Sequence, residues 1–237
     1  MNGRRLVVLL AAVAAAALTA RLGVWQLDRA AQKNALQAAL DERRALPPLP
    51  AYALARNESE AALQHHRTVQ LRGRWLGEAT VYLENRQMNG RPGFYVVTPL
   101  VLGDGSAVAV QRGWLARDSN ERTRVAAPAT PTGEVEVNGR LAPPPARLYE
   151  FDGAASGPIR QNLDLVVWGS ETRLVLKPLS VVQEDGAASV PADGLLRQWP
   201  APAAGVHKHH GYAFQWFALS ALIVGLYVWF QLIRPQR

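Results

Sequence analysis

The chain contains no cysteine, which excludes several classes of protein at once. Without thiols it forms no disulfide bond, uses no cysteine nucleophile and builds no thiolate metal site. Dense runs of positive charge are missing as well. The formal net charge is +7, but the arginines are scattered between apolar residues, apart from the pairs at 4–5 and 43–44. Because a nucleic-acid surface needs a basic stripe or patch, nucleic-acid binding is not expected.

Sequence motifs of common enzyme classes are also missing. The chain contains no GxSxG elbow, no HExxH motif, no P-loop and no GxGxxG followed by a helix pattern. Carboxylates such as Glu78, Glu84 and Asp164 lie beside no sequence signal for general acid–base catalysis. We therefore expect a protein that is not an enzyme.

What the chain does have is two long apolar runs, one towards each end. The second run, Tyr212 to Ile233, is 22 residues long and carries no charge. As a helix it would extend over about 33 Å, enough to cross the hydrocarbon core of a bilayer. We predict a transmembrane helix at residues 212–233.

The first apolar run, residues 6–20, fits either a cleavable signal or an anchor. A cut after Ala17 would satisfy the need for small residues at the cleavage site, so cleavage stays open. However, the apolar character continues past Arg21 and reaches 22 residues, 6–27, if the arginine extends to the interface. We favour an uncleaved transmembrane helix at residues 6–27.

The short tails predict the orientation of both spans. Arginines lie in residues 1–5 and 234–237, and neither tail has a carboxylate. Because Lys and Arg are enriched on the cytoplasmic side, both tails are expected in the cytoplasm and the central region on the other side. No amphipathic transit segment precedes the first span, so the simplest host is a bacterial inner membrane, with the central region in the periplasm.

The central region is expected to be mostly β. Residues 28–46 are expected to extend the first span as a helix, because apolar residues recur at helical spacing among good helix formers. Prolines at 47, 48 and 50 end this helix. Strand patterns then begin at Ala79, Phe94, Ala107, Val135 and Leu174. The GDGS sequence at 103–106 predicts a hairpin turn. We expect an antiparallel barrel or sandwich over residues 47–205, with the strand order left open.

Four motifs occur in a fixed order along the chain: LGVWQLDR at 22–29, LENRQMNGRPGFYVVTPL at 83–100, VQRGWL at 110–115 and HHGYAFQWF at 209–217. On these motifs the chain resembles the Surfeit locus protein 1 family, the Surf/Shy assembly factors of cytochrome c oxidase. The resemblance extends over about residues 22–230 and includes both apolar runs. Each motif alone is weak, whereas four in order between two spans are specific.

The resemblance implies a non-enzymatic membrane protein that assembles the haem-copper oxidase and holds haem a for insertion. Its implied partners are the oxidase subunits, above all the haem-bearing catalytic subunit, together with haem a biosynthetic enzymes and the bilayer. The family's HxxYAxxW pattern falls on His209, Tyr212, Ala213 and Trp216. His207 and His210 depart from its simplest form, so the identity of the ligand is open among three histidines. The alternative function is a scaffold without haem that stabilises assembly intermediates.

The residues themselves give His209 a physical interpretation beside this resemblance. Haem iron binds a neutral imidazole, and a position at the amino end of a helix disfavours the protonated form. His209, Ala213 and Trp216 would share one helix face, on which a flat macrocycle could lie. Alternatively, the histidines at 206–211 are interfacial residues and the aromatic residues form a membrane belt. A metal ion has less support, because no HxxxH pair accompanies the cluster.

Arg21 is a second candidate, about six residues inside the outer end of the first span. It could pair with haem propionates or with an acidic group of the oxidase, or it could simply extend to the interface. Trp25 and Arg29 follow at i+4 and i+8, on one broad face with Arg21. The remaining motif residues, which include Arg112 and Trp114, are expected to be structural.

Overall fold

The computed structural model describes residues 3–118, 121, 125–149, 157–185, 193–200 and 205–234. The chain forms two compact units. The helical unit combines residues 1–39 with residues 201–237, and the β domain is Leu40–Pro200.

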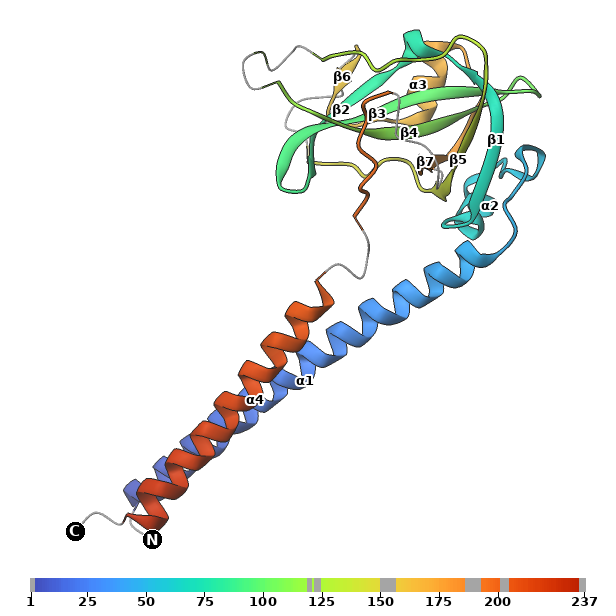
Figure 1. Ribbon diagram of the computed structural model, residues 1–237. Coiled ribbons are helices and arrows are strands. Elements are labelled where there is room, and N and C mark those ends of the chain that lie inside the picture. Colours follow the sequence, from blue (N-terminus) through green and yellow to red (C-terminus); the bar gives the residue numbers. More distant parts are fainter. Residues whose placement is uncertain are drawn as a thin grey trace. The chain divides into compact units, whose positions relative to one another are not determined.

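The helical unit consists of two antiparallel helices, α1 (Gly3–Ala45) and α4 (Val206–Val228), and α4 continues into the π-helical turn η3 (Trp229–Ile233). Both ends of the chain lie at the same end of this unit (Figure 1). Both helices are long and apolar enough to cross a membrane. Only 11% and 6% of their apolar windows are buried, unlike the core helix of a soluble protein.

A seven-residue repeat determines which sides of the two helices face each other. The buried and partly buried positions of α1 include the series Leu9, Ala12, Ala16, Thr19, Gly23, Gln26 and Ala30. The matching series on α4 is Val206, His209, Ala213, Trp216, Ser220, Ile223 and Tyr227. Both series alternate between three and four residues, the spacing of a left-handed coiled coil. We call the surface between these two series the seam.

Small residues let the helices approach closely along the seam, as is usual between helices in membranes. The Ser220 hydroxyl donates a hydrogen bond across it to the carbonyl of Ala16, at 2.9 Å. Gly23 lies beneath the ring of Phe217, where a Cβ atom would be 2.8 Å from two ring carbons. Thr19 is the one buried hydroxyl residue of the described part of α1, and it donates to the carbonyls of Ala15 and Ala16 within its own helix.

The β domain is built from seven strands: β1 (Thr68–Trp75), β2 (Val81–Met88), β3 (Arg91–Leu102), β4 (Ala107–Ala116), β5 (Glu134–Ala142), β6 (Ile159–Arg160) and β7 (Leu176–Gln183). Their order in the sheet is β1-β5-β7-β4-β3-β2-β6, and β1 also pairs with β3. This additional pairing closes β1, β5, β7, β4 and β3 into a barrel (Figure 1). A core of aliphatic side chains from these strands fills its interior.

Short helices surround the barrel. The 3₁₀ turns η1 (Ala51–Ala53) and η2 (Gly77–Ala79) precede β1 and β2, and α2 (Glu58–Gln64) begins where the Asn57 side chain accepts a hydrogen bond from the Glu60 amide. The helix α3 (Leu165–Thr172) begins in the same way at Asp164, which accepts from the Val166 and Val167 amides. Trp168 of α3 is buried against a second apolar cluster on β2, β3 and β4.

Most of the elements expected from the sequence are confirmed. All five predicted strands are present, α1 runs without a break to Ala45, and the GDGS turn joins β3 to β4. In that turn the Asp104 carboxylate accepts from the Ser106 amide at 2.9 Å. Of the two architectures expected, the structure has the barrel. The expectation of a purely antiparallel sheet was wrong, because β4–β7 and β2–β6 are parallel pairs. Each parallel pair joins strands far apart in sequence, which a local pattern cannot indicate.

Candidate functional site

Three histidines lie in the first two turns of α4, but they point in different directions. The helix begins after Gly205, so the histidines belong to the helix rather than to a separate interfacial segment. Successive residues are about 100° apart around a helix, which separates His209 from its neighbour His210. His207 and His210 are exposed, whereas His209 is partly buried on the seam. The structure thus distinguishes one of the three candidates.

His209 is bound to α1 by a hydrogen bond between side chains. Its Nδ1 lies 2.7 Å from Oε1 of Gln26. An amide oxygen can only accept, so Nδ1–H is the donor in this pairing. In the neutral imidazole, Nε2 then keeps its lone pair. Nε2 forms no hydrogen bond with the residues that the structure describes. In its neutral form, His209 therefore has one nitrogen oriented by Gln26 and one nitrogen available to a ligand.

The face that His209 shares with Ala213 and Trp216 is covered by α1. Ala213 is only 2% exposed, and Trp216 is partly buried on the seam. The expectation that a flat macrocycle could lie on this face is therefore wrong, because the second helix occupies it. Tyr212, one residue off the seam, is 52% exposed. A ligand would have to reach Nε2 of His209 from beside the seam.

Arg21 and Trp25 lie away from His209. Arg21 is two residues from both Thr19 and Gly23, a rotation of about 200° from each, so it is on the opposite side of α1 and exposed. Trp25 is 46% exposed, with the guanidinium of Arg29 5.7 Å from its ring. The structure brings Gln26, rather than these two residues, to the candidate ligand. A role for Arg21 towards a partner protein stays a prediction.

The donor set at His209 fits a haem iron better than a free metal ion. The part of the chain that the structure describes contains no group of three or more His, Asp or Glu side chains suited to a metal ion. A single histidine can hold a haem iron, and the second ring nitrogen of such a histidine is typically held by an acceptor. His209 and Gln26 supply that arrangement.

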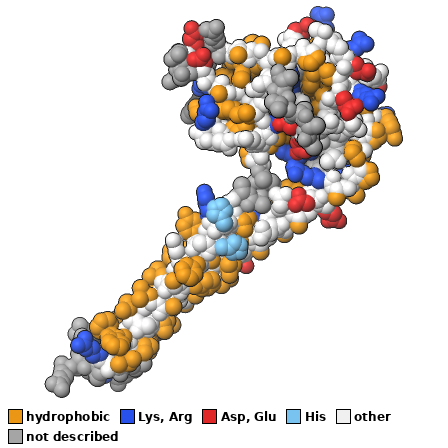
Figure 2. All heavy atoms as spheres, in the orientation of Figure 1, with side chains coloured by type: hydrophobic (Ala, Val, Ile, Leu, Met, Phe, Trp, Pro, Cys, Tyr) orange, Lys and Arg blue, Asp and Glu red, His pale blue; other side chains and the backbone are white. Residues whose placement is uncertain are grey.

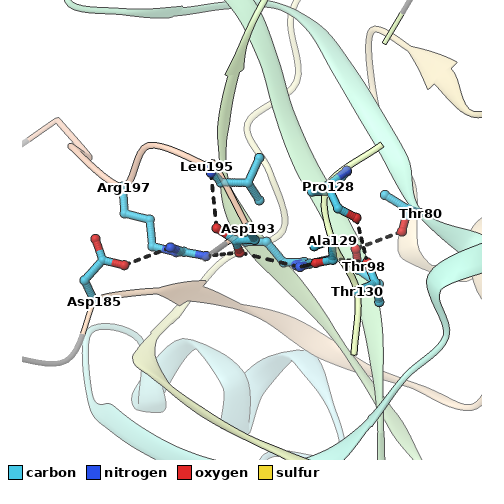
Figure 3. A network of polar contacts seen from close by, with 10 residues as sticks. Thr80, Thr98, Pro128, Ala129, Thr130, Asp185, Asp193, Leu195 and Arg197 are labelled. Carbon is cyan, nitrogen blue, oxygen red and sulfur yellow. Dashed lines mark hydrogen bonds and ion pairs between the residues drawn. The ribbon is translucent and has the colours of Figure 1, made fainter. Parts of the chain in front are cut away.

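Buried arginines of the β domain take part in a network of polar contacts (Figure 3). This network holds segments of the domain together. The Arg112 side chain is 2% exposed and donates to Thr130 Oγ1 at 2.7 Å and to the Ala129 carbonyl at 2.8 Å. Asp193 accepts from both Arg112 and Arg197, and Asp185 accepts from Arg197 at 2.8 Å. Burial lowers the pKa of Arg112, and Asp193 opposes that shift. The network attaches the segment at 193–197 to strand β4.

The motif glycines and tryptophans of the β domain also have structural roles. Trp114 is buried and donates from its indole nitrogen to the Arg86 carbonyl at 2.9 Å. A Cβ atom on Gly93 would lie 2.5 Å from the Trp114 ring and 2.2 Å from the Leu115 carbonyl oxygen. The motifs LENRQMNGRPGF and VQRGWL therefore meet in one packed cluster formed by β2, β3 and β4.

The fold places the chain in a class of proteins in which two apolar helices, long enough to cross a membrane, come before and after a β-barrel domain in the sequence. The model of the SURF1 family matches residues 13–221, most of the chain. The chain therefore belongs to the SURF1 family, which confirms the resemblance seen in the sequence.

Individual relatives agree with this family. The chain is 28% identical over 210 residues to a SURF1-like protein of Rickettsia bellii, which covers 87% of this chain and 83% of that protein. A SURF1-like protein of Rickettsia felis is 27% identical over 211 residues, with 87% and 89% covered. The cytochrome oxidase assembly protein SHY1 of Saccharomyces cerevisiae is 29% identical over 100 residues, which are 41% of this chain and 25% of the yeast protein.

Proposed function

We propose that this chain is a membrane-anchored assembly factor for cytochrome c oxidase, which holds haem a through His209 before its insertion into the catalytic subunit. The observation that carries the haem assignment is the pairing of His209 Nδ1 with Gln26 Oε1 on the seam, which leaves Nε2 for the iron. The protein acts by binding and presenting its cargo, and no catalysis is required of it.

The assignment to oxidase assembly is supported by the family. The chain belongs to the SURF1 family, and its yeast relative SHY1 is named as a cytochrome oxidase assembly protein. The partners that follow are the oxidase subunits, above all the haem-bearing catalytic subunit. Enzymes of haem a biosynthesis are the source from which the chain would receive its cargo.

Membrane anchoring is supported by the length and the surface of the helical unit. Hydrophobic side chains cover most of its visible face in Figure 2, and histidine side chains gather towards one end. Both chain ends lie at the other end, so one crossing by each helix brings both tails to the same side (Figure 1). The basic tails favour the cytoplasm for that side. This arrangement supports a bacterial inner membrane, with the β domain in the periplasm.

His209 lies one turn into α4, near the membrane surface in this arrangement. A neutral imidazole is the form that binds iron. When bound, haem a would supply an iron that accepts the imidazole of His209, and its apolar tail would suit the lipid. The chain's own contribution is the oriented imidazole of His209.

A scaffold without haem is the second candidate function, and the closed seam favours it. Because α1 covers the Ala213 face of α4, the helix pair provides no preformed slot for a macrocycle among the described residues. In a scaffold, the exposed apolar sides of both helices would instead hold oxidase subunits during assembly.

Complementation of a deletion strain separates the two functions. We expect His209→Ala to lower the haem a content and the oxygen consumption of the oxidase strongly, with the amount of the variant protein in the membrane unchanged. His210→Ala is the matched control, since His210 is adjacent but exposed, and it should support normal assembly. If His209→Ala assembles oxidase as well as the control does, haem binding through His209 is not required for assembly, which contradicts this assignment and favours the scaffold.

A further inference from the structure

We propose that Gln26 is the positioning residue of this site: its side-chain oxygen accepts from Nδ1–H of His209 and fixes the tautomer and the orientation of the neutral imidazole, so that Nε2 is the nitrogen presented to the ligand. The inference rests on the proposed function only in naming haem iron as that ligand. The state of the imidazole itself is a property of the chain alone.

The position of Gln26 on the seam supports this role. It is the one amide in the seam series of α1, and it is enclosed by Gly23 one turn before and Ala30 one turn after, both buried. Because these neighbours are small, α4 comes near enough for a side chain on each helix to meet at 2.7 Å.

The apolar surroundings on the two helices favour a hydrogen bond between Gln26 and His209. An amide or an imidazole on an otherwise apolar pair of helices is costly unless it finds a partner. Gln26 and His209 are partly buried and hydrogen-bonded to each other, and His209 has no other hydrogen bond with the described residues. In the structure the atom that faces Nδ1 is the amide oxygen, so in this pairing Nδ1–H is the donor.

The chemical consequence is a better ligand. A neutral imidazole unconstrained by its surroundings divides its proton between two nitrogens, and only the form protonated on Nδ1 presents a lone pair on Nε2. Fixing this form removes the need to select it on binding. An acceptor on Nδ1–H also increases the basicity of the metal-binding nitrogen. Loss of such a partner typically weakens metal binding by about 10–100-fold.

If Gln26 only stabilised the association of α1 with α4, the expected results would be different. Its substitution would affect the association of α1 with α4 and leave the tautomer and the iron–imidazole bond alone. The test therefore uses Gln26→Met, which keeps the length but removes the acceptor, and Gln26→Glu, which keeps an acceptor oxygen. Gln215→Met is the matched control, because Gln215 is an exposed glutamine of α4 that lies off the seam.

The first measurement is nitrogen NMR of the histidine rings in the haem-free, full-length protein in detergent micelles, with the His209 signals assigned by their loss in His209→Ala. We expect the Nδ1-protonated form in the parent, in Gln26→Glu and in Gln215→Met. In Gln26→Met we expect a mixture in which the Nε2-protonated form dominates. An unchanged tautomer in Gln26→Met, with helicity retained, would overturn the proposal.

The second measurement titrates the same four proteins with haemin and records the iron–histidine stretching frequency of the reduced complexes. Gln26→Met should bind about 10–100-fold more weakly and show a lower frequency, while Gln26→Glu and Gln215→Met should stay close to the parent. Parent-like binding and frequency in Gln26→Met would overturn the positioning role. Absence of haemin binding by the parent would instead contradict the haem function, and the NMR result would still decide the tautomer.

Discussion

Gly23 shows how one residue controls the contact between the two apolar helices. A Cβ atom at this position would lie 2.8 Å from the ring of Phe217. We expect Gly23→Leu to push α4 away from α1, because a branched side chain cannot share that space. The chain has no cysteine, so a pair introduced at Ala16 and Ser220 reports the separation. In the parent these positions should form a disulfide readily, and in Gly23→Leu much more slowly.

The matched control is Gly225→Leu, since a Cβ atom on Gly225 meets nothing within 4 Å. It adds the same side chain to α4 and should leave the cross-linking rate unchanged. Equal rates in Gly23→Leu and Gly225→Leu would show that the seam does not pass through Gly23.

Asp193 carries much of the stability of the buried arginine network. Its carboxylate lies between Arg112 and Arg197, whose side chains are 2% and 3% exposed. We expect Asp193→Ala to destabilise the β domain by about 3–5 kcal/mol, because it leaves two buried cations without their shared anion. Urea unfolding of the full-length protein in detergent, followed by tryptophan fluorescence, measures this loss.

The comparison for Asp193 is Glu136→Ala, which breaks the ion pair with Arg72 on the surface of β1 and β5. An exposed pair of this kind contributes about 0–1 kcal/mol. If both variants lose the same stability, the buried network is not a stabilising element of the domain.

The candidate ligand could be found from the sequence, but its partner could not. His209 is recognisable because a histidine at the start of an apolar helix is unusual and belongs to the family's motif. Gln26 also lies in a motif, LGVWQLDR, but its role depends on which side of α1 faces α4. The spacing of small residues from Ala16 through Gly23 to Ala30 contains that information. The role of Gln26 can be inferred from this spacing only when the pairing of α1 with α4 is known.

The pairing of β1 with β3 closes the barrel, and Gly73 permits it. Gly73 of β1 is opposite Leu102 of β3, and a Cβ atom there would be 2.4 Å from the Val101 carbonyl oxygen. We expect Gly73→Val to separate the two strands and to lower the thermal unfolding temperature of the β domain by several degrees. Circular dichroism in the β-sheet region measures this change.

Gly103→Ala is the control for this element, because a Cβ atom on Gly103 meets nothing within 4 Å. It should unfold at the temperature of the parent. A Gly73→Val variant as stable as Gly103→Ala would mean that closure of the barrel contributes little to stability.

Local elements were easier to predict than the pairing between them. The β3–β4 hairpin follows from a turn sequence between two strand patterns, and α1 follows from its composition. The strand β1 was missed although its burial alternates, with Val69, Leu71 and Gly73 inside. Gly73 takes the place of an apolar side chain in that alternation, which weakens the pattern in the sequence. The parallel pairing of β4 with β7 depends on contacts between distant segments, for which a single sequence gives no local signal.

At the scale of the whole molecule, the account predicts one orientation across the membrane. Cysteines introduced one at a time at Gly3 and after Arg237 should react with an impermeant maleimide only after cell lysis. A cysteine at Gly103, in the β domain, should react in cells whose outer membrane alone has been permeabilised. Reaction of Gly3→Cys before lysis would reverse the orientation. A mature Gly3→Cys protein that reacts neither before nor after lysis would indicate that the first helix has been cleaved off.

The most direct test of the central claim is the visible absorption spectrum of the full-length protein, purified in detergent from cells that synthesise haem a. The account predicts a haem spectrum in the parent, its loss in His209→Ala, and its retention in His207→Ala and His210→Ala at matched protein content. A parent without haem would contradict the account and favour the scaffold. Haem retained by His209→Ala would show that His209 is not the ligand.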